Sequence, residues 1–251
     1  MDFKTALNAE IETIPGKKRQ KLLDALNTPS KPRDTKPDKP TFKITSESEP
    51  DFQRIIFLSK NTELIFANKS NETIQWVDLE LPTTFSDAGR RRCVDLIGMR
   101  DNVPFLCELK YSNSNESHGD PPHYGILQLL IYYYHAINNA KELHKHSVYH
   151  VRGQIDLGQI REFNWEDISK TLIFSANKRY WKYYFYDRAY EGQEALLKLV
   201  RKFNENYDLN LLLFKTEEVD FASQKMSRLQ DESNKANSRW RQISAEDCFV
   251  R

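Results

Sequence analysis

The sequence predicts one α/β domain in which helices flank a mixed central sheet. Three observations carry this prediction. Short runs of β-branched and aromatic residues recur from about residue 52 and are separated by polar turns. Two long stretches with helical periodicity, residues 123–146 and 190–208, interrupt those runs. The resulting order of strands, helix, strand, helix and strand is typical of an α/β fold.

Composition narrows the classes of function. The 37 Lys and Arg residues nearly balance the 36 Asp and Glu residues, which excludes a uniformly basic nucleic-acid coat but allows a local basic face. Neither G-x-G-x-x-G nor G-x-x-x-x-G-K-[ST] occurs, so dinucleotide and P-loop nucleotide sites lose their usual support. The three isolated cysteines form no disulfide framework, and no apolar stretch approaches 18 residues. We therefore expect a cytoplasmic protein with no membrane partner.

The chain divides into three predicted regions. Residues 1–45 hold two short helices, separated at Pro15-Gly16, and a Pro/Lys-rich linker over 28–43. These accessory helices are a candidate surface for a homodimer or a partner protein. Residues 46–221 form the main domain. Residues 222–251 are polar, with Trp240 and Phe249 as anchors, and predict a peripheral helix or tail.

Within the main domain, each predicted strand is a short apolar run bounded by turn residues. Arg100-Asp101-Asn102 is a tight polar connection that predicts a hairpin between two of them. The strands are expected over 52–59, 62–69, 73–81, 92–99, 103–111, 171–176, 182–187 and 209–215.

Acidic and basic residues converge on the predicted hairpin. Asp95 lies in its first strand, and Glu108-Leu109-Lys110 ends its second. Alternation along a strand puts Leu106, Glu108 and Lys110 on one face. If the hairpin pairs as its length indicates, Asp95 comes alongside Glu108. Two carboxylates and an ammonium group then meet at the edge of a sheet.

Such a set suits phosphate chemistry with a divalent cation. Mg²⁺ and Mn²⁺ take oxygen ligands, and proteins commonly hold Mg²⁺ with one or two carboxylates plus substrate phosphate oxygens. The cation offsets carboxylate repulsion and lowers the pKa of a bound water. A neighbouring lysine can stabilise charge that develops on the phosphorus.

Asp95 followed by Glu108-Leu109-Lys110 on consecutive strands resembles the PD-(D/E)XK nuclease superfamily. The usual proline before the aspartate is replaced by Val94. Gln128 and Tyr132, in the following predicted helix, are similar to the Q-x-x-x-Y motif of the RecB and lambda-exonuclease branch, and they share one helix face. The resemblance implies a restriction-endonuclease-like fold and Mg²⁺- or Mn²⁺-dependent hydrolysis of DNA.

The resemblance also implies roles for individual residues. Asp95 and Glu108 would bind the metal with the Leu109 carbonyl, Lys110 would be the catalytic lysine, and Gln128 and Tyr132 would support the site or contact the DNA backbone. The family also usually carries an acidic residue on an earlier helix. Glu10, Glu63 and Glu80 are the candidates, and Glu80 is favoured because it lies in an apolar run.

Other interpretations stay open. Glu108 and Lys110 alone could be a surface ion pair worth under about 1 kcal/mol. Gln128 and Tyr132 could belong to an aromatic core stripe. The domain could bind nucleic acid or protein without cutting, or be an unrelated α/β enzyme. Endonuclease and exonuclease activities, roles in repair, restriction or phage defence, and an RNA substrate remain equally compatible with the motif.

Two clusters outside the motif add candidates. The basic residues Arg90, Arg91 and Arg92 before the Asp95 strand, and Lys178 and Arg179 further along, predict phosphate contacts. The histidines invite a zinc or HNH-type interpretation, but no cysteine is near and their spacing fits no common zinc signature. They are His118, His123, His135, His144, His146 and His150.

Overall fold

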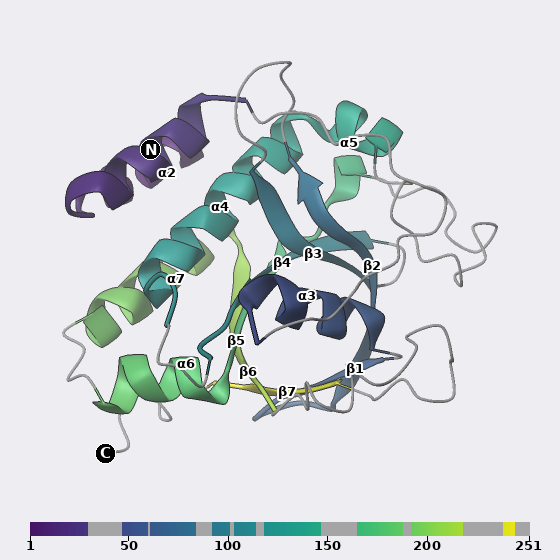
Figure 1. Ribbon diagram of the computed structural model, residues 1–251. Helices are drawn as coiled ribbons and strands as arrows, with labels where there is room; N and C mark the ends of the chain where they lie inside the picture. Colours follow the sequence, from purple (N-terminus) through teal and green to yellow (C-terminus); the bar gives the residue numbers. More distant parts are fainter. Residues whose placement is uncertain are drawn as a thin grey trace.

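The computed structural model describes residues 1–29, 47–59, 61–83, 92–100, 103–113, 118–146, 165–187, 192–217 and 238–243. Among these residues, seven strands form one closed sheet, in which spatial order follows sequence order (Figure 1). The strands are β1 (Thr62–Ile65), β2 (Glu72–Pro82), β3 (Cys93–Arg100), β4 (Val103–Lys110), β5 (Thr171–Asn177), β6 (Asn210–Thr216) and β7 (Ser238–Gln242).

The prediction of a restriction-endonuclease-like open sheet flanked by helices is wrong, because β7 closes the sheet into a barrel. β7 runs antiparallel to β6 and parallel to β1, so that Trp240 lies between Thr216 and Leu64. The predicted C-terminal helix or tail thus contains a strand. Its sequence, SRWRQ, has one apolar residue, and nothing local marks Trp240 as fully buried against Trp76 (ring centroids 5.1 Å apart).

The predicted hairpin is confirmed, and its register sets which residues lie at the carboxyl end of β4. β3 and β4 pair antiparallel from Arg100 opposite Val103 to Leu96 opposite Cys107. β4 also pairs parallel with β5, and β5 pairs parallel with β6. Because parallel strands end at the same edge, Lys110 at the end of β4 lies beside the end of β5.

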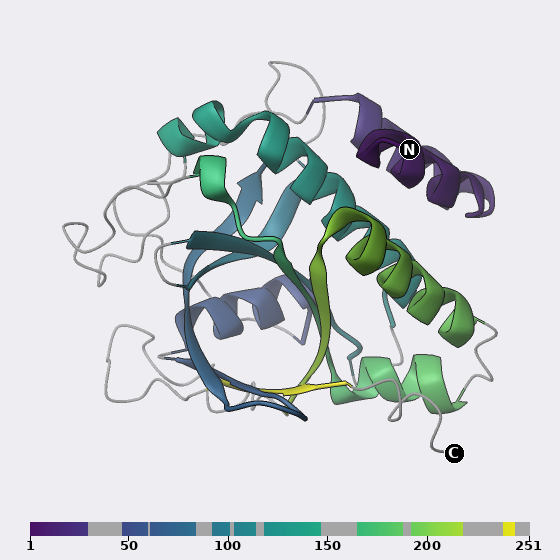
Figure 2. The same ribbon diagram turned by 180° about the vertical axis from the view of Figure 1, so that it is seen from behind.

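The predicted strand at 52–59 is instead helix α3 (Glu49–Leu58). The Ser48 hydroxyl caps it by accepting a hydrogen bond from the Asp51 backbone N–H, and Pro50 occupies the first turn. The helix lies within the curve of the sheet (Figure 2), where its apolar side chains join the inner core. That core contains Phe52, Ile56, Phe57, Trp76, Leu96, Phe105, Phe214 and Trp240.

A second core lies on the outer face of β3, β4 and β5 and is covered by helices. α4 (Pro122–Asn138) packs on that face, and α7 (Gly192–Tyr207) packs beside it. The two predicted N-terminal helices are confirmed as α1 (Phe3–Glu12) and α2 (Gly16–Asn27), and they pack on α4. Their apolar side chains, among them Leu7, Ile11, Leu22 and Leu26, are buried in this outer core.

Two further elements differ from the sequence prediction. The long helix is divided: α4 ends at Asn138, and α5 covers Ala140–His146. Residues 182–187 form no strand, since α6 (Lys178–Lys182) continues into the π-helical turn η3 (Tyr183–Asp187). The Tyr180 ring contacts the Tyr184 ring in a tilted arrangement, and the Trp181 ring stacks on the Phe185 ring. The aromatic run therefore has a spacing of four rather than two. A short 3-10 turn, η2, covers Trp165–Asp167.

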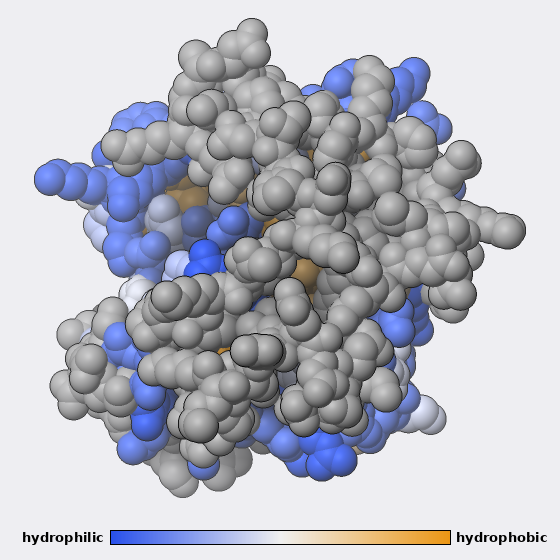
Figure 3. Space-filling model, turned by 45° about the vertical axis from the view of Figure 1, so that its right-hand side comes forward, coloured by the Kyte–Doolittle hydropathy of each residue, from blue (hydrophilic) through white to orange (hydrophobic). Residues whose placement is uncertain are grey.

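Few large hydrophobic side chains are exposed among the described residues, and those that are belong to Met1 and Ile137. On the face drawn in Figure 3, the coloured residues are mostly hydrophilic, and apolar ones are visible only in small areas between them. None of the described helices has the length and apolar character needed to cross a membrane.

Closure of the barrel by Trp240 can be tested by mutation. Trp240→Ala removes a fully buried side chain, and we expect it to lower the free energy of unfolding by about 3–5 kcal/mol in urea denaturation. Arg239→Ala is the matched control, because the exposed Arg239–Glu63 ion pair contributes about 0–1 kcal/mol. Equal, small effects of both variants would mean that 238–242 is the peripheral tail that the sequence predicts.

Candidate active site

The site begins where β3 and β4 stop pairing. Their last ladder pair is Leu96 with Cys107, so the next residues, Asp95 and Glu108, lie side by side beyond it. The Asp95 side chain replaces the missing ladder bond: its Oδ2 accepts a hydrogen bond of 2.7 Å from the Leu109 backbone N–H. The expected neighbourhood of Asp95 and Glu108 is therefore present, and the opening between the strands makes room for their carboxyl groups.

Glu108 and Lys110 form a buried ion pair on the outer face of β4. Lys110 Nζ lies 2.6 Å from Glu108 Oε1, and their side chains are 6% and 2% exposed. The alternation predicted for β4 is confirmed, because Cys107 and Leu109 belong to the inner core and Leu106 to the outer one. The pair is not a solvated surface contact, so the exposed ion-pair interpretation is wrong.

A glycine in α4 allows the helix to approach this lysine. A Cβ atom on Gly125 would lie 3.3 Å from Lys110 Cε and 2.5 Å from Phe174 Cε2. Real Cβ atoms do not approach a ring that closely, so any larger residue would push α4 away from β4. The Lys110 side chain is thereby held between the helix and the sheet, with its ammonium group directed at Glu108.

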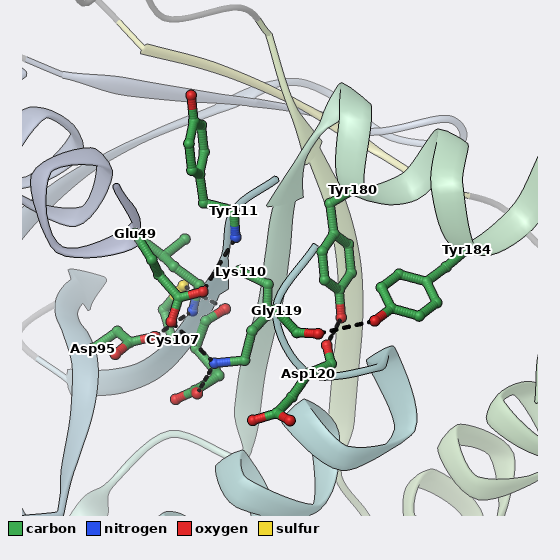
Figure 4. Close-up of polar contacts among 11 residues, drawn as sticks. Glu49, Asp95, Cys107, Lys110, Tyr111, Gly119, Asp120, Tyr180 and Tyr184 are labelled. Carbon is green, nitrogen blue, oxygen red and sulfur yellow. Dashed lines mark hydrogen bonds and ion pairs between the residues drawn. The ribbon is translucent and has the colours of Figure 1, made fainter. Parts of the chain in front are cut away.

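Glu49, at the start of α3, completes the cluster, and the sequence reasoning did not find it. Its Oε1 lies 3.6 Å from Lys110 Nζ, and its Oε2 accepts a hydrogen bond of 3.3 Å from the Tyr111 backbone N–H (Figure 4). The available signal was Ser48-Glu49-Pro50-Asp51, a helix-start pattern of cap, proline and acidic first turn. The strand that the sequence predicts over 52–59 leaves no helix for this pattern to begin, so the pattern does not lead to Glu49.

Two of the three acidic residues proposed from the sequence for this role lie away from the cluster. Glu10 pairs with Lys202 between α1 and α7, at 2.5 Å, and Glu63 pairs with Arg239 between β1 and β7. Glu80 lies in β2 between Leu79 and Leu81, which pair with Leu96 and Val94, so its register position is opposite Asp95; its φ is positive, at 52°. The acidic residue that contacts Lys110 from an earlier helix is Glu49.

Burial and mutual repulsion make the two central carboxyls weak acids. Burial raises the pKa of Glu108 to about 7, against the opposing attraction of the Lys110 ammonium group. Burial also raises the pKa of Asp95 well above its usual value, and the negative charge of Glu108 adds to that shift. Burial alone would lower the pKa of Lys110, but Glu108, Glu49 and Asp95 together raise it, so the lysine stays charged. Three carboxyl groups therefore share one ammonium group, and the raised pKa values of Asp95 and Glu108 favour their protonated forms.

Tyr132 of the Q-x-x-x-Y pair on α4 lies near the cluster. Burial raises the pKa of the Tyr132 hydroxyl well above its usual value, and the charges of Glu108 and Asp95 raise it further. Gln128, one helical turn earlier, is half-buried, and its Oε1 has no hydrogen-bond partner among the described residues. A buried oxygen without a partner is costly.

A network beside Lys110 holds the segment between β4 and α4. Asn177 accepts a hydrogen bond from the Ser112 N–H and donates one to the Ser112 carbonyl. From α6, the Tyr180 hydroxyl donates to the Asp120 carbonyl at 2.6 Å, and from η3 the Tyr184 hydroxyl donates to the Gly119 carbonyl at 3.0 Å (Figure 4). The wall of the site on this side is therefore formed by α6 and η3.

The predicted phosphate-binding residues separate into three groups. Arg90 and Arg91 lie outside the described residues. Arg92 donates hydrogen bonds to the carbonyls of Asp24 and Thr28, so it fastens the end of α2. Lys178 and Arg179 are exposed at the start of α6, directly after the strand that ends beside Lys110.

The donors available to a metal are carboxylates. Among the described residues, no three His, Cys, Asp or Glu side chains already surround one point that could hold a metal ion. Mg²⁺ does not require such a group, since two carboxylates plus water and phosphate oxygens suffice. Among the described side chains, the histidines form no metal-binding group: His118 contacts Ser112 and His135 contacts the Ala25 carbonyl. The side chains of His144, His146 and His150 lie outside the described residues.

Comparisons with known proteins add no assignment. No family model, no curated protein sequence and no solved structure matches this chain. The geometry of the site is therefore the basis for any functional proposal.

The raised pKa of Glu108 predicts how stability depends on pH. The folded protein holds this proton up to about pH 7 and the unfolded chain only to about 4.5, so the free energy of unfolding falls between those values as the pH rises. Glu108→Gln removes this contribution. The difference between wild type and variant in urea denaturation should change by no more than about 3 kcal/mol over that range. A constant difference would show that Glu108 titrates as an ordinary carboxyl group.

Proposed function

We propose that this protein is a divalent-metal-dependent deoxyribonuclease whose site consists of Asp95, Glu108, Lys110 and Glu49. The observation that carries the proposal is the buried meeting of the Asp95 and Glu108 carboxyl groups at the end of β4, with Lys110 Nζ 2.6 Å from Glu108 Oε1. The similarity to PD-(D/E)XK nucleases rests on these residues and on Gln128 and Tyr132. It does not rest on the barrel.

The donor set fits Mg²⁺ or Mn²⁺. Asp95 and Glu108 would hold the ion with the Leu109 carbonyl, and Glu49 is the best placed further carboxylate because it already contacts Lys110. A bound ion would supply positive charge for the phosphate and a water of lowered pKa. It would also offset the negative charge of Glu108, which adds to burial in raising the pKa of Asp95.

The protein's own groups have separate tasks in hydrolysis. A water attacks phosphorus and loses a proton, while the departing sugar oxygen gains one. Lys110 remains charged and can stabilise the negative charge that grows on the phosphate oxygens. Glu49 and Gly125 position its ammonium group, and the Leu109 N–H fixes Asp95. Lys178 and Arg179 are placed to bind backbone phosphates.

The cytoplasm is the proposed location, because the isolated cysteines form no disulfide framework.

Nuclease activity can be measured with Mg²⁺ or Mn²⁺ on linear, nicked, supercoiled and single-stranded DNA. We expect cleavage by wild type and a loss of at least about 100-fold in Lys110→Ala, because the charge on the reacting phosphate is left unopposed. Lys170→Ala is the matched control, since this exposed lysine pairs with Asp208 away from the cluster. DNA binding without cutting by wild type and Lys110→Ala would establish a silent binding module instead.

Metal binding can be measured separately from cleavage. At about 100 times its Kd, Mg²⁺ should raise the free energy of unfolding by about 2.7 kcal/mol at pH 8, and less at pH 5.5 where protons occupy the carboxyls. Asp95→Asn should abolish the effect, while Glu63→Gln, on β1, should keep it. Equal stabilisation of wild type and Asp95→Asn would place the ion elsewhere.

A further inference from the structure

Two aromatic rings stack at the rim of the candidate active site. The His118 and Tyr183 rings are parallel within 12°, with centroids 3.4 Å apart. Both residues are half-buried, whereas their aromatic neighbours Tyr180, Trp181 and Tyr184 are buried in the outer core. Tyr183 also packs against the outer core, so the stacked pair differs from the rest of this aromatic segment in being less deeply buried.

Hydrogen bonds connect this pair to the end of β4. His118 Nδ1 lies 3.2 Å from the hydroxyl of Ser112, two residues beyond Lys110. Asn177 binds the backbone of the same Ser112 at 3.0 Å and 2.8 Å and also caps α6, the helix that leads to Tyr183. The two rings are thus fixed relative to Lys110 rather than carried on an unattached loop.

Exposed cations flank the rings. Lys178 and Arg179 lie in the first turn of α6, between Asn177 and Tyr183 in the chain. Burial and the negative charge of Glu47 raise the pKa of Tyr111, the residue after Lys110, and the charge of Arg179 opposes them. Accessible rings beside a positively charged surface are the combination by which proteins hold single strands, since bases stack on the rings and phosphates meet the cations.

We propose that the stacked pair His118–Tyr183, with Lys178 and Arg179, binds single-stranded DNA and delivers it to Lys110. A duplex keeps its bases stacked on each other, so it offers no free base face to these rings. This inference rests on the proposed nuclease function and names its substrate class: a single strand or an unpaired end.

The test is binding in EDTA, where cleavage does not occur, measured by fluorescence anisotropy with a labelled oligonucleotide of about 16 nucleotides. Wild type should bind the single strand more tightly than the duplex of the same sequence. Tyr183→Ala should weaken single-strand binding about 10-fold and leave duplex binding unchanged, because it removes a stacking surface but no charge. Arg179→Ala should weaken binding to both forms and reduce the salt dependence.

Two controls separate stacking from folding. Tyr183→Phe keeps the ring and should retain single-strand affinity. Tyr134→Ala removes another half-buried ring, stacked on Phe3 of α1, and should leave DNA binding unchanged. Equal affinity for both DNA forms, or a Tyr183→Ala protein that binds the single strand normally, would overturn the inference. Binding that depends on Tyr183, but without cleavage in Mg²⁺ or Mn²⁺, would support this surface and refute only the nuclease.

Discussion

The buried Glu108–Lys110 pair is the interaction on which the rest of this site depends. Its two charges lie on the outer face of β4, beneath α4, where water cannot screen them. Taking them out of water is costly, and the attraction repays that cost only when the geometry is good and further hydrogen bonds are made. Here the surrounding charge is unbalanced, because Asp95 and Glu49 bring two more carboxyl groups to one lysine. An ion pair that served stability alone would not need two further carboxyl groups beside it.

The fold provides this pair with neighbours from both of its cores. β4 separates the inner core around α3 from the outer core beneath α4, so residues from both sides meet only at its end. Glu49 reaches Lys110 from the inner helix, and Tyr132 approaches Glu108 from the outer one. The end of β4 lies next to the end of β5 because the two strands are parallel, and this brings α6 to the same edge. Closure of the barrel is therefore compatible with a site that the sequence associated with an open sheet.

Local signals were sufficient for the centre of the site and insufficient for its surroundings. Asp95, Glu108 and Lys110 follow from strand alternation and hairpin length, which act over a few residues. Gln128 and Tyr132 follow from one turn of a helix. Glu49 does not follow from the local pattern, because an apolar run of eight residues fits a strand and a buried helix equally well. The Ser48 cap before the run is the signal that favours the helix. The prediction of an open sheet was wrong because closure of the barrel depends on the burial of Trp240. That burial depends on ring contacts with Trp76 and Phe214, which are distant in the chain.

Diffraction from a crystal containing Mn²⁺ tests the central claim most directly, because the anomalous signal locates the ion without reference to activity. We expect one strong peak within about 2.5 Å of carboxylate oxygens from both Asp95 and Glu108. The peak should be absent in crystals of Asp95→Asn grown and soaked in the same way. A wild-type crystal whose Asp95 and Glu108 carry no Mn²⁺ at saturating concentration would contradict metal binding at this site, and the cluster would then be a buried ion-pair network of structural origin.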